Sequence, residues 1–234
     1  MSAIDFRQTF SGLPRLVMFD LDGTLVDSVP DLTAAIDAML KEMRSPPAGE
    51  AKVRLWVGNG AGVLVRRALA NIDGIDETQV EAALHQAALR RFLSHYRRIS
   101  GRYSTLYAGV QSALIRLQQA GVAIAVVTNK PAEFVPHLLD DLELEPYVSA
   151  WLGGDSLAQK KPHPAPLESL LQRFGVKPAA ALMVGDSRSD MLAGKAAKVA
   201  TLGVSYGYNH GNPIEDESPT WVTGNLDNFF AVIL

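Results

Sequence analysis

Two aspartates, Asp20 and Asp22, follow the short apolar run Leu16 to Phe19. An apolar run bounded by turn-forming residues is typical of a buried strand in a parallel sheet. Aspartate is disfavoured in strands and is costly to bury without a partner, so both charges need compensation. In open α/β sheets ligands bind at the carboxyl ends of the strands, so this position predicts chemistry. The alternative is a helix cap followed by a turn at Asp22-Gly23.

Polar residues also follow other apolar runs of the chain. The stretch TNK (128–130) follows one run, and GDS (185–187) follows another, with Asp190 at the start of a predicted helix. The stretch QKKPHPAP (159–166) places lysines before prolines, which rigidify a loop. Because parallel strands end at the same edge of a sheet, we expect these polar groups to lie close together.

The converging carboxylates favour a hard cation. Asp20, Asp22 and Asp186 come together without histidine or cysteine, which favours Mg²⁺ over Zn²⁺, and Mg²⁺ is usually bound by one or two carboxylates together with phosphate oxygens. A carboxylate that attacks a phosphate ester is repelled by about 4 kcal/mol for each pair of unit charges at about 4 Å and an effective dielectric constant of about 20. A divalent cation and a lysine offset this repulsion. The set therefore predicts a two-step phosphate ester hydrolysis through an aspartyl phosphate, although the spacing does not tell whether Asp20 or Asp22 is the nucleophile.

Bulk composition excludes several classes of function. The 234 residues carry a formal net charge of −3, which argues against nucleic acid as a partner. No cysteine is present, so disulfides, thiolate nucleophiles and cysteine zinc sites are excluded. The longest aliphatic run, 122–127, is too short to cross a bilayer, so we expect no membrane association and a cytoplasmic location. The expected partner is a small anionic phosphate ester, and the chain is expected to be a monomer or a homodimer.

The order of patterns along the chain predicts an α/β fold with an insertion. Beyond residue 109, apolar runs at 122–129, 148–154, 180–186 and 199–204 alternate with amphipathic segments, which is typical of a doubly wound parallel sheet. Between 29 and 98 every periodic segment indicates a helix. We therefore expect a Rossmann-like α/β core of residues 1–28 and 104–234, and a helical cap of residues 29–103 inserted after the first strand. The expected hinges lie at 27–30 and 99–109.

Four motifs carry a family resemblance that covers nearly the whole chain. The stretches FDLDGTLVDS (19–28), VVTNK (126–130), KKPHP (160–164) and VGDSRSD (184–190), in this order, resemble the signature motifs of phosphatases of the haloacid dehalogenase superfamily. This resemblance implies the core and cap described above. It also implies that Asp20 is the nucleophile and a metal ligand, and that Asp22 is the acid and base whose backbone carbonyl meets the metal.

The same resemblance implies roles for the other motif residues. Thr128 binds phosphate, Lys161 stabilises charge with Lys160 as the alternative, Asp186 ligates Mg²⁺, and Asp190 supports the metal site or the lysine. The metal set is thus Asp20, Asp22, Asp186 and Asp190. Within the same motifs, we expect further substrate contacts from Gly23, Thr24 and Asn129.

Substrate choice is expected in the cap. The stretch LWVGNGAGVLVRRAL (55–69) is predicted to be a loop entering a helix, where Asn59, Arg66 or Arg67 and free amides could meet an anionic tail. Together with YAGV (107–110), residues 153–167 and GVSYGYNHG (203–211), it is similar to bacterial phosphoglycolate phosphatases, which implies 2-phosphoglycolate as the leading substrate. Alternatives are a sugar phosphatase, an intramolecular sugar phosphomutase and, from another class, a receiver-like phospho-aspartate module.

Overall fold

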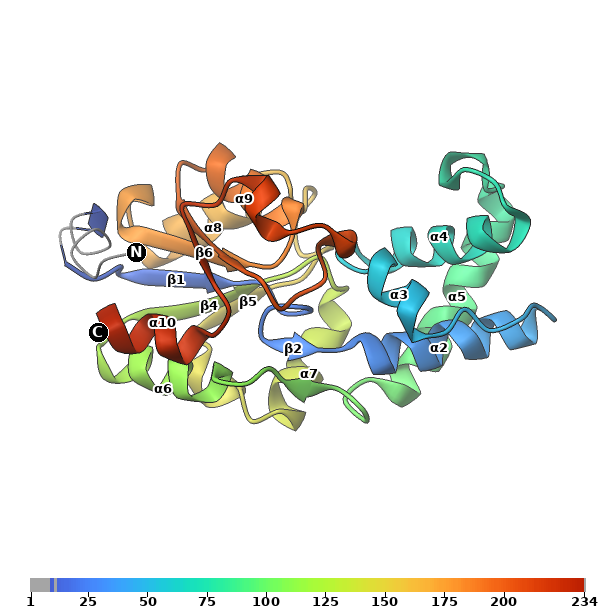
Figure 1. The fold of residues 1–234 in the computed structure, drawn as a ribbon, viewed down its shortest axis with the longest axis horizontal. Helices are drawn as coiled ribbons and strands as arrows, with labels where there is room; N and C mark the ends of the chain where they lie inside the picture. The colour runs from blue at the N-terminus through green and yellow to red at the C-terminus, as the bar shows by residue number, and fades with distance from the viewer. Residues whose placement is uncertain (1–8, 11, 234) are drawn as a thin grey trace.

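The computed structural model describes residues 9, 10 and 12–233. The predicted core segment 1–28 is therefore described only in part, because residues 1–8 and 11 lie outside this range, as does Leu234. None of the helices in the described ranges combines the length and apolar character needed to cross a membrane. Figure 1 shows a sheet domain on the left and a group of helices, α2 to α5, on the right.

The centre of the molecule is a six-stranded parallel sheet with the order β5-β4-β1-β6-β7-β8. The first strand lies in the middle of the sheet, and its residues Leu16 to Phe19 are fully buried. Apolar side chains on both faces explain this burial, since helices cover both faces of a parallel sheet. The strands are β1 (Leu16–Phe19), β4 (Ala123–Val127), β5 (Ala150–Leu152), β6 (Ala181–Gly185), β7 (Ala200–Val204) and β8 (Trp221–Thr223).

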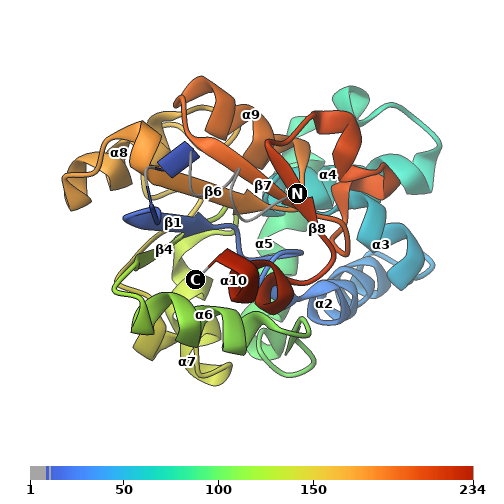
Figure 2. The same ribbon diagram turned by 60° about the vertical axis from the view of Figure 1, so that its left-hand side comes forward.

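Helices pack on both faces of this sheet, as Figures 1 and 2 show. One face carries α6 (Val110–Gln119), α7 (Val135–Asp141) and α10 (Leu226–Ile233), with an apolar cluster between them and the sheet. The opposite face carries α8 (Ala165–Phe174) and α9 (Arg188–Ala196) over a second cluster. The predicted doubly wound α/β fold is confirmed.

The inserted segment forms a separate apolar cluster of its own. Its helices are α2 (Val29–Glu42), α3 (Glu50–Trp56), α4 (Ala61–Asp73) and α5 (Ala82–Ile99), with a 3-10 turn at Glu77–Gln79. Their apolar faces pack together, and of the sheet-domain residues that the structure describes, Phe134 and Tyr208 join the buried part of this cluster. We call these helices, with their connecting loops, the cap; the exact boundaries 29–103 stay a prediction.

Both connections to the cap meet in a small antiparallel pair, β2 (Val26–Asp27) and β3 (Thr105–Leu106). The buried Asp31 in the first turn of α2 accepts hydrogen bonds from the backbone N–H groups of Gly101 and Tyr103. The two chain crossings are therefore tied to one another at the predicted hinges. This pairing and strand β8 were not among the strands expected from the sequence.

Candidate active site

Three buried carboxylates meet at the carboxyl edge of the sheet. Asp20 follows β1, Asp186 follows β6, and Asp190 lies in the first turn of α9. One oxygen from each of these side chains lies within 4.8 Å of the others. The expected convergence of the strand ends is thus present, because neighbouring parallel strands β1 and β6 deliver their following residues to one edge.

Lys161 supplies the positive charge of this cluster. Its Nζ lies 2.9 Å from Oδ1 of Asp20 and 2.5 Å from Oδ1 of Asp190, and its side chain is 2% exposed. Lys160, the alternative considered for this role, instead donates a hydrogen bond of 2.9 Å to the carbonyl of Asn59 in the cap. The structure therefore brings Lys161, and not Lys160, to Asp20.

The cluster has more negative than positive charge, and the acidities of its groups reflect this. Burial, as the largest cause, raises the pKa of Asp20 to about 7; the charge of Lys161 opposes the rise and that of Asp190 adds to it. Burial and the charges of Asp20 and Asp190 raise the pKa of Asp186 well above its ordinary value. Three buried carboxylates with one lysine suit a divalent cation, which offsets such repulsion, and oxygen ligands suit a hard cation. The residues present therefore fit a metal ion, and Asp20, Asp186 and Asp190 could hold it.

Asp186 is held in place by the loop after β1 and by the loop after β7. Its Oδ1 accepts a hydrogen bond of 3.2 Å from the Thr24 hydroxyl, and its Oδ2 accepts one of 2.8 Å from the backbone N–H of Tyr208. Gly23 has a φ of +92°, and a Cβ at this position would lie 2.3 Å from Oδ2 of Asp186. Thr24 thus supports Asp186 and Gly23 makes room for it, and the substrate contacts expected of both residues stay a prediction.

Asp190 joins the lysine to the start of α9. Its Oδ1 accepts from Lys161, while its Oδ2 accepts hydrogen bonds from the backbone N–H and the hydroxyl of Ser187, at 3.1 and 2.7 Å. Ser187 precedes the first turn of the helix, so these bonds form a helix-capping arrangement. These contacts hold the Asp190 side chain in place, and it in turn positions the Lys161 ammonium.

Asp22 turns its carboxylate to a different lysine. Its two oxygens accept from Nζ of Lys130 at 3.0 and 3.2 Å, and the same Nζ donates to the Tyr96 hydroxyl of the cap at 2.5 Å. The Asp22 side chain is thus absent from the three-carboxylate cluster of the described residues. Sequence reasoning gave Lys130 and Tyr96 no role, although a lysine at the end of a buried strand was a signal for the first. The predicted metal contact of the Asp22 backbone carbonyl stays a prediction.

A cavity opens between the core and the cap beside these groups. Thr128 is buried in its wall, and its Oγ1 accepts a hydrogen bond of 3.2 Å from the backbone N–H of Lys130, which leaves the hydroxyl hydrogen for another acceptor. The core contributes Asp20, Asp22, Thr128, Asn129, Lys130 and Pro131, and the cap contributes Leu32, Val57, Gly58, Gly60, Ala61, Leu64, Phe92 and Tyr96. The cavity thus has an acidic and cationic floor and an apolar cap wall.

Two asparagines that were expected to bind substrate join the core to the cap. The Asn129 Nδ2 donates to the carbonyl of Gly58 in the cap at 3.2 Å and to the carbonyl of Lys161 at 3.0 Å. The Asn59 Nδ2 donates to the hydroxyl of Ser189 on α9 at 3.2 Å. Asn129 lies in the cavity wall, whereas Asn59 does not line it.

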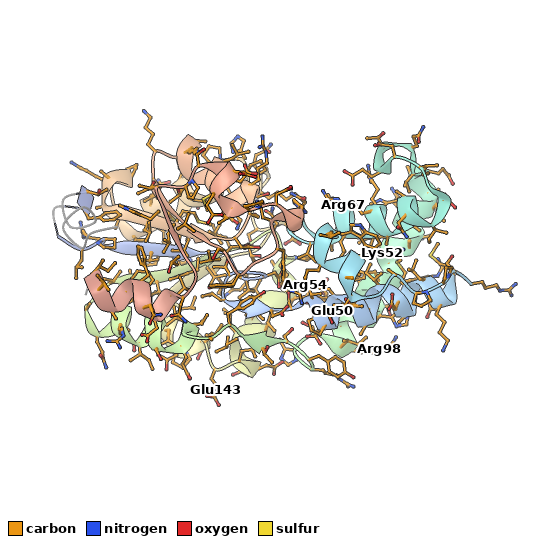
Figure 3. All side chains as sticks on the ribbon, in the orientation of Figure 1. Glu50, Lys52, Arg54, Arg67, Arg98 and Glu143 are labelled. Carbon is orange, nitrogen blue, oxygen red and sulfur yellow. The ribbon has the colours of Figure 1, made fainter. Side chains whose placement is uncertain are left out.

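The two arginines of α4 do not line the cavity. Arg67, labelled in Figure 3, donates to Glu77 at 2.9 Å and to the carbonyl of Trp56 at 2.7 Å, so its guanidinium ties parts of the cap together. Arg66 is half-buried in the same helix. The contact of Arg66 or Arg67 with a substrate carboxylate stays a prediction.

Comparison with known proteins identifies the family. The sequence profile of haloacid dehalogenase-like hydrolases matches residues 17–204. The chain is 54% identical over 222 residues to a phosphoglycolate phosphatase of Pseudomonas putida, covering 94% of this chain and 80% of that protein. It is also 54% identical over 217 residues to phosphoglycolate phosphatase 1 of Pseudomonas aeruginosa, covering 92% of this chain and 78% of that protein.

A solved structure has the same architecture. The crystal structure of a predicted phosphoglycolate phosphatase from Haemophilus somnus superposes with a TM-score of 0.88 at 38% sequence identity, covering 94% of this chain and 98% of that one. A match that runs from β1 to β7 leaves the receiver-like alternative without support. The chain belongs to the haloacid dehalogenase-like hydrolase family.

Proposed function

We propose that this protein is a Mg²⁺-dependent phosphatase that hydrolyses 2-phosphoglycolate to glycolate and phosphate through an aspartyl phosphate on Asp20. The observation that carries the proposal is the Lys161 ammonium, 2.9 Å from Asp20 at the carboxyl edge of the sheet and beside two further carboxylates. The substrate is proposed because the relatives of 54% identity are named phosphoglycolate phosphatases.

The proposed reaction uses the core residues in two steps. A carboxylate oxygen of Asp20 forms a bond to phosphorus while the bond between phosphorus and the glycolate oxygen breaks, and Asp22 gives its proton to that oxygen. Asp22 then takes a proton from water, and the resulting oxygen attacks phosphorus and releases Asp20. Lys161 and the Thr128 hydroxyl hold the phosphoryl oxygens throughout.

The proposed metal ligands are Asp20, Asp186 and the backbone carbonyl of Asp22, with Asp190 supporting the site through Lys161. When bound, Mg²⁺ would supply the positive charge that offsets repulsion between the Asp20 carboxylate and the phosphoryl oxygens. The raised pKa of Asp20 and of Asp186 supports this assignment, since a cation is what restores both groups to the ionised form.

The cap is proposed to be a domain that closes over the substrate, with residues 29–103 moving on the hinge pair β2 and β3. Support comes from its separate apolar cluster and from the polar contacts it makes with the core through Asn59 and Gly58. Closure would exclude bulk water from the phosphoryl group during its transfer to Asp20. The cytoplasmic location and the monomeric or dimeric state stay predictions.

Phosphate release tests the proposal directly. The wild-type protein is incubated with 2-phosphoglycolate, ethyl phosphate, glucose 1-phosphate and glucose 6-phosphate, with Mg²⁺ and with a chelator. We expect the highest kcat/KM on 2-phosphoglycolate, dependence on Mg²⁺, and no release by Asp20→Asn, whose circular dichroism should match the wild type. Full activity of Asp20→Asn would overturn the mechanism, and conversion of glucose 1-phosphate to the 6-phosphate without free phosphate would favour a phosphomutase.

A further inference from the structure

We propose that Lys130, supported by Tyr96, binds the carboxylate of the substrate, and that the incoming carboxylate takes the place of Asp22 on the Lys130 ammonium. This inference rests on the proposed function, since it concerns the half of 2-phosphoglycolate that the core motifs do not bind. It assigns specificity to a core lysine and a cap tyrosine in place of the arginines of α4.

Lys130 is the only cationic side chain that lines the cavity among the residues the structure describes. It is 4% exposed. Neither Lys161, which lies beside Asp20 where the phosphoryl group is proposed to bind, nor Arg67 is among the residues that line the cavity. A second anionic group in this cavity therefore has one side chain with which to form an ion pair. A buried ammonium in an apolar setting discriminates strongly between a charged and a neutral ligand.

Tyr96 holds this ammonium from the cap side. Its hydroxyl lies 2.5 Å from Nζ of Lys130, and the ammonium lies 4.8 Å from the centre of its ring. The ring itself is fixed by stacking on Phe92, with centroids 5.5 Å apart, and by an edge contact with Phe134 at 4.7 Å. The ammonium is thus positioned in advance, and its position depends on the cap being closed against the core.

The rest of the cap wall suits a small anion but supplies no other charge. Leu32, Val57 and Leu64 make it apolar, while Gly60 and Ala61 bring the start of α4 to the cavity. First-turn amides of a helix have no partner within the helix, and Gly60 offers no side-chain cap. These amides would assist a carboxylate that Lys130 binds.

Lys130 has two side-chain partners, Asp22 and Tyr96, and the substrate carboxylate is proposed to replace Asp22. In the structure, Asp22 pairs with the Lys130 ammonium, and its carboxylate is held away from the three-carboxylate cluster. A substrate carboxylate competes for the same ammonium and releases the Asp22 carboxylate, which then takes up a proton from the solvent and transfers it to the leaving oxygen. A phosphate ester without a carboxylate leaves Asp22 paired. The proposal therefore predicts that a carboxylate improves kcat as well as KM.

Steady-state kinetics of Lys130 variants on 2-phosphoglycolate and ethyl phosphate test this subsite. The two esters share the phosphate and the two-carbon frame and differ in the carboxylate. We expect Lys130→Met to lower kcat/KM for 2-phosphoglycolate by about 30-fold or more, the loss typical of an unpaired buried charge. The value for ethyl phosphate should not fall, because Asp22 no longer has Lys130 as a partner. Lys130→Arg, which keeps the charge, should retain part of the preference.

Matched variants test whether Lys130, and not a cationic side chain of the cap, binds the carboxylate. Lys52→Met removes a lysine from the exposed face of α3 (Figure 3) and should leave kcat/KM unchanged for both substrates. Arg66→Met removes one of the two arginines that the sequence suggested, and it should also leave the preference intact. Tyr96→Phe keeps the ring and loses the hydroxyl, so the preference should fall by about tenfold. If Lys130→Met does not fold, as judged by its thermal unfolding, Tyr96→Phe decides the question.

Three outcomes would overturn the inference: an unchanged preference in Lys130→Met, equal losses on both esters, or loss of the preference in Arg66→Met. Inhibition by glycolate gives a second readout, and it should weaken in Lys130→Met while inhibition by inorganic phosphate persists. A wild-type enzyme that shows no preference for 2-phosphoglycolate contradicts the proposed function instead. The two failures are therefore distinguishable.

Discussion

The ammonium of Lys161 and the carboxylate of Asp190 lie 2.5 Å apart, and both side chains are almost fully buried. Asp190 also caps α9 through Ser187, so the lysine is anchored to a helix of the core. Asp190 thereby fixes the ammonium beside Asp20, which lies 2.9 Å from it on another side.

Asp190→Asn should lower kcat by about 10- to 100-fold, because the amide holds the ammonium less firmly and removes one charge from the metal site. Phosphate release from 2-phosphoglycolate at saturating substrate measures this. Asp227→Asn is the matched control, since its exposed partner Arg116 lies on α6 away from the site. An Asp190→Asn enzyme with wild-type kcat would contradict the role of Asp190 in positioning the Lys161 ammonium.

Gly23→Ala should weaken metal binding. The added Cβ would lie 2.3 Å from Oδ2 of Asp186, and the φ of +92° already disfavours any side chain. We expect a loss of about 1–3 kcal/mol in the free energy of unfolding together with a higher Mg²⁺ concentration for half-maximal activity. Gly175→Ala, at a φ of +61° with open space around it, should show the stability loss without the change in Mg²⁺ dependence.

Gly60→Ala should separate the cap from the core. A Cβ there would lie 2.9 Å from the backbone oxygen of Asn129, and its φ is +90°. We expect KM for 2-phosphoglycolate to rise by about 5- to 30-fold, equivalent to about 1–2 kcal/mol of strain. Gly74→Ala at the other end of α4 has a φ of +64° and meets no atom within 4 Å, so it should leave KM unchanged. Equal KM values in both variants would contradict cap closure on Asn129.

The stability gained from Mg²⁺ should grow with pH. The pKa of Asp20 is about 7 in the folded metal-free protein, above the ordinary value of 3.8, so the folded state holds a proton that the unfolded state has lost between these values. Metal-free stability should therefore fall as pH rises from about 4 to about 7. Mg²⁺ binds the ionised carboxylates, so the shift in Tm that it causes should be larger at pH 8 than at pH 5. A shift independent of pH would contradict metal binding at Asp20.

The sequence was sufficient for the features that depend on apolar runs and strand ends. The runs 122–129, 148–154, 180–186 and 199–204 each contain a strand of the sheet, and the carboxylates that follow β1 and β6 meet as parallel strands require. Strand β8 was missed because it is a short edge strand with partly exposed residues. The pairing of β2 with β3 was missed because two-residue strands leave no periodic pattern.

Side-chain partners were less predictable than backbone positions. Arg66 or Arg67 was expected to meet a substrate carboxylate, and no local pattern indicated that Arg67 pairs with Glu77 within the cap. The Thr24 hydroxyl donates a hydrogen bond to Asp186, and the Asp22 carboxylate forms an ion pair with Lys130. Tyr96 lies on α5, where the sequence pattern indicates only a buried helix face, but its hydroxyl accepts a hydrogen bond from Lys130 in the site. These contacts depend on how the cap sits on the core, which no local stretch of sequence contains.

The most direct test of the central claim is to locate the phosphoryl group during turnover. Asp22→Asn, which loses the acid of the first step and the base of the second, is mixed with 2-phosphoglycolate and Mg²⁺, quenched in acid over a range of times and mapped by peptide mass spectrometry. The account predicts a phosphoryl group on Asp20, and none when Asp20 is also changed to Asn. Phosphate released at the wild-type rate by Asp20→Asn, or a phosphoryl group on another residue, would contradict it.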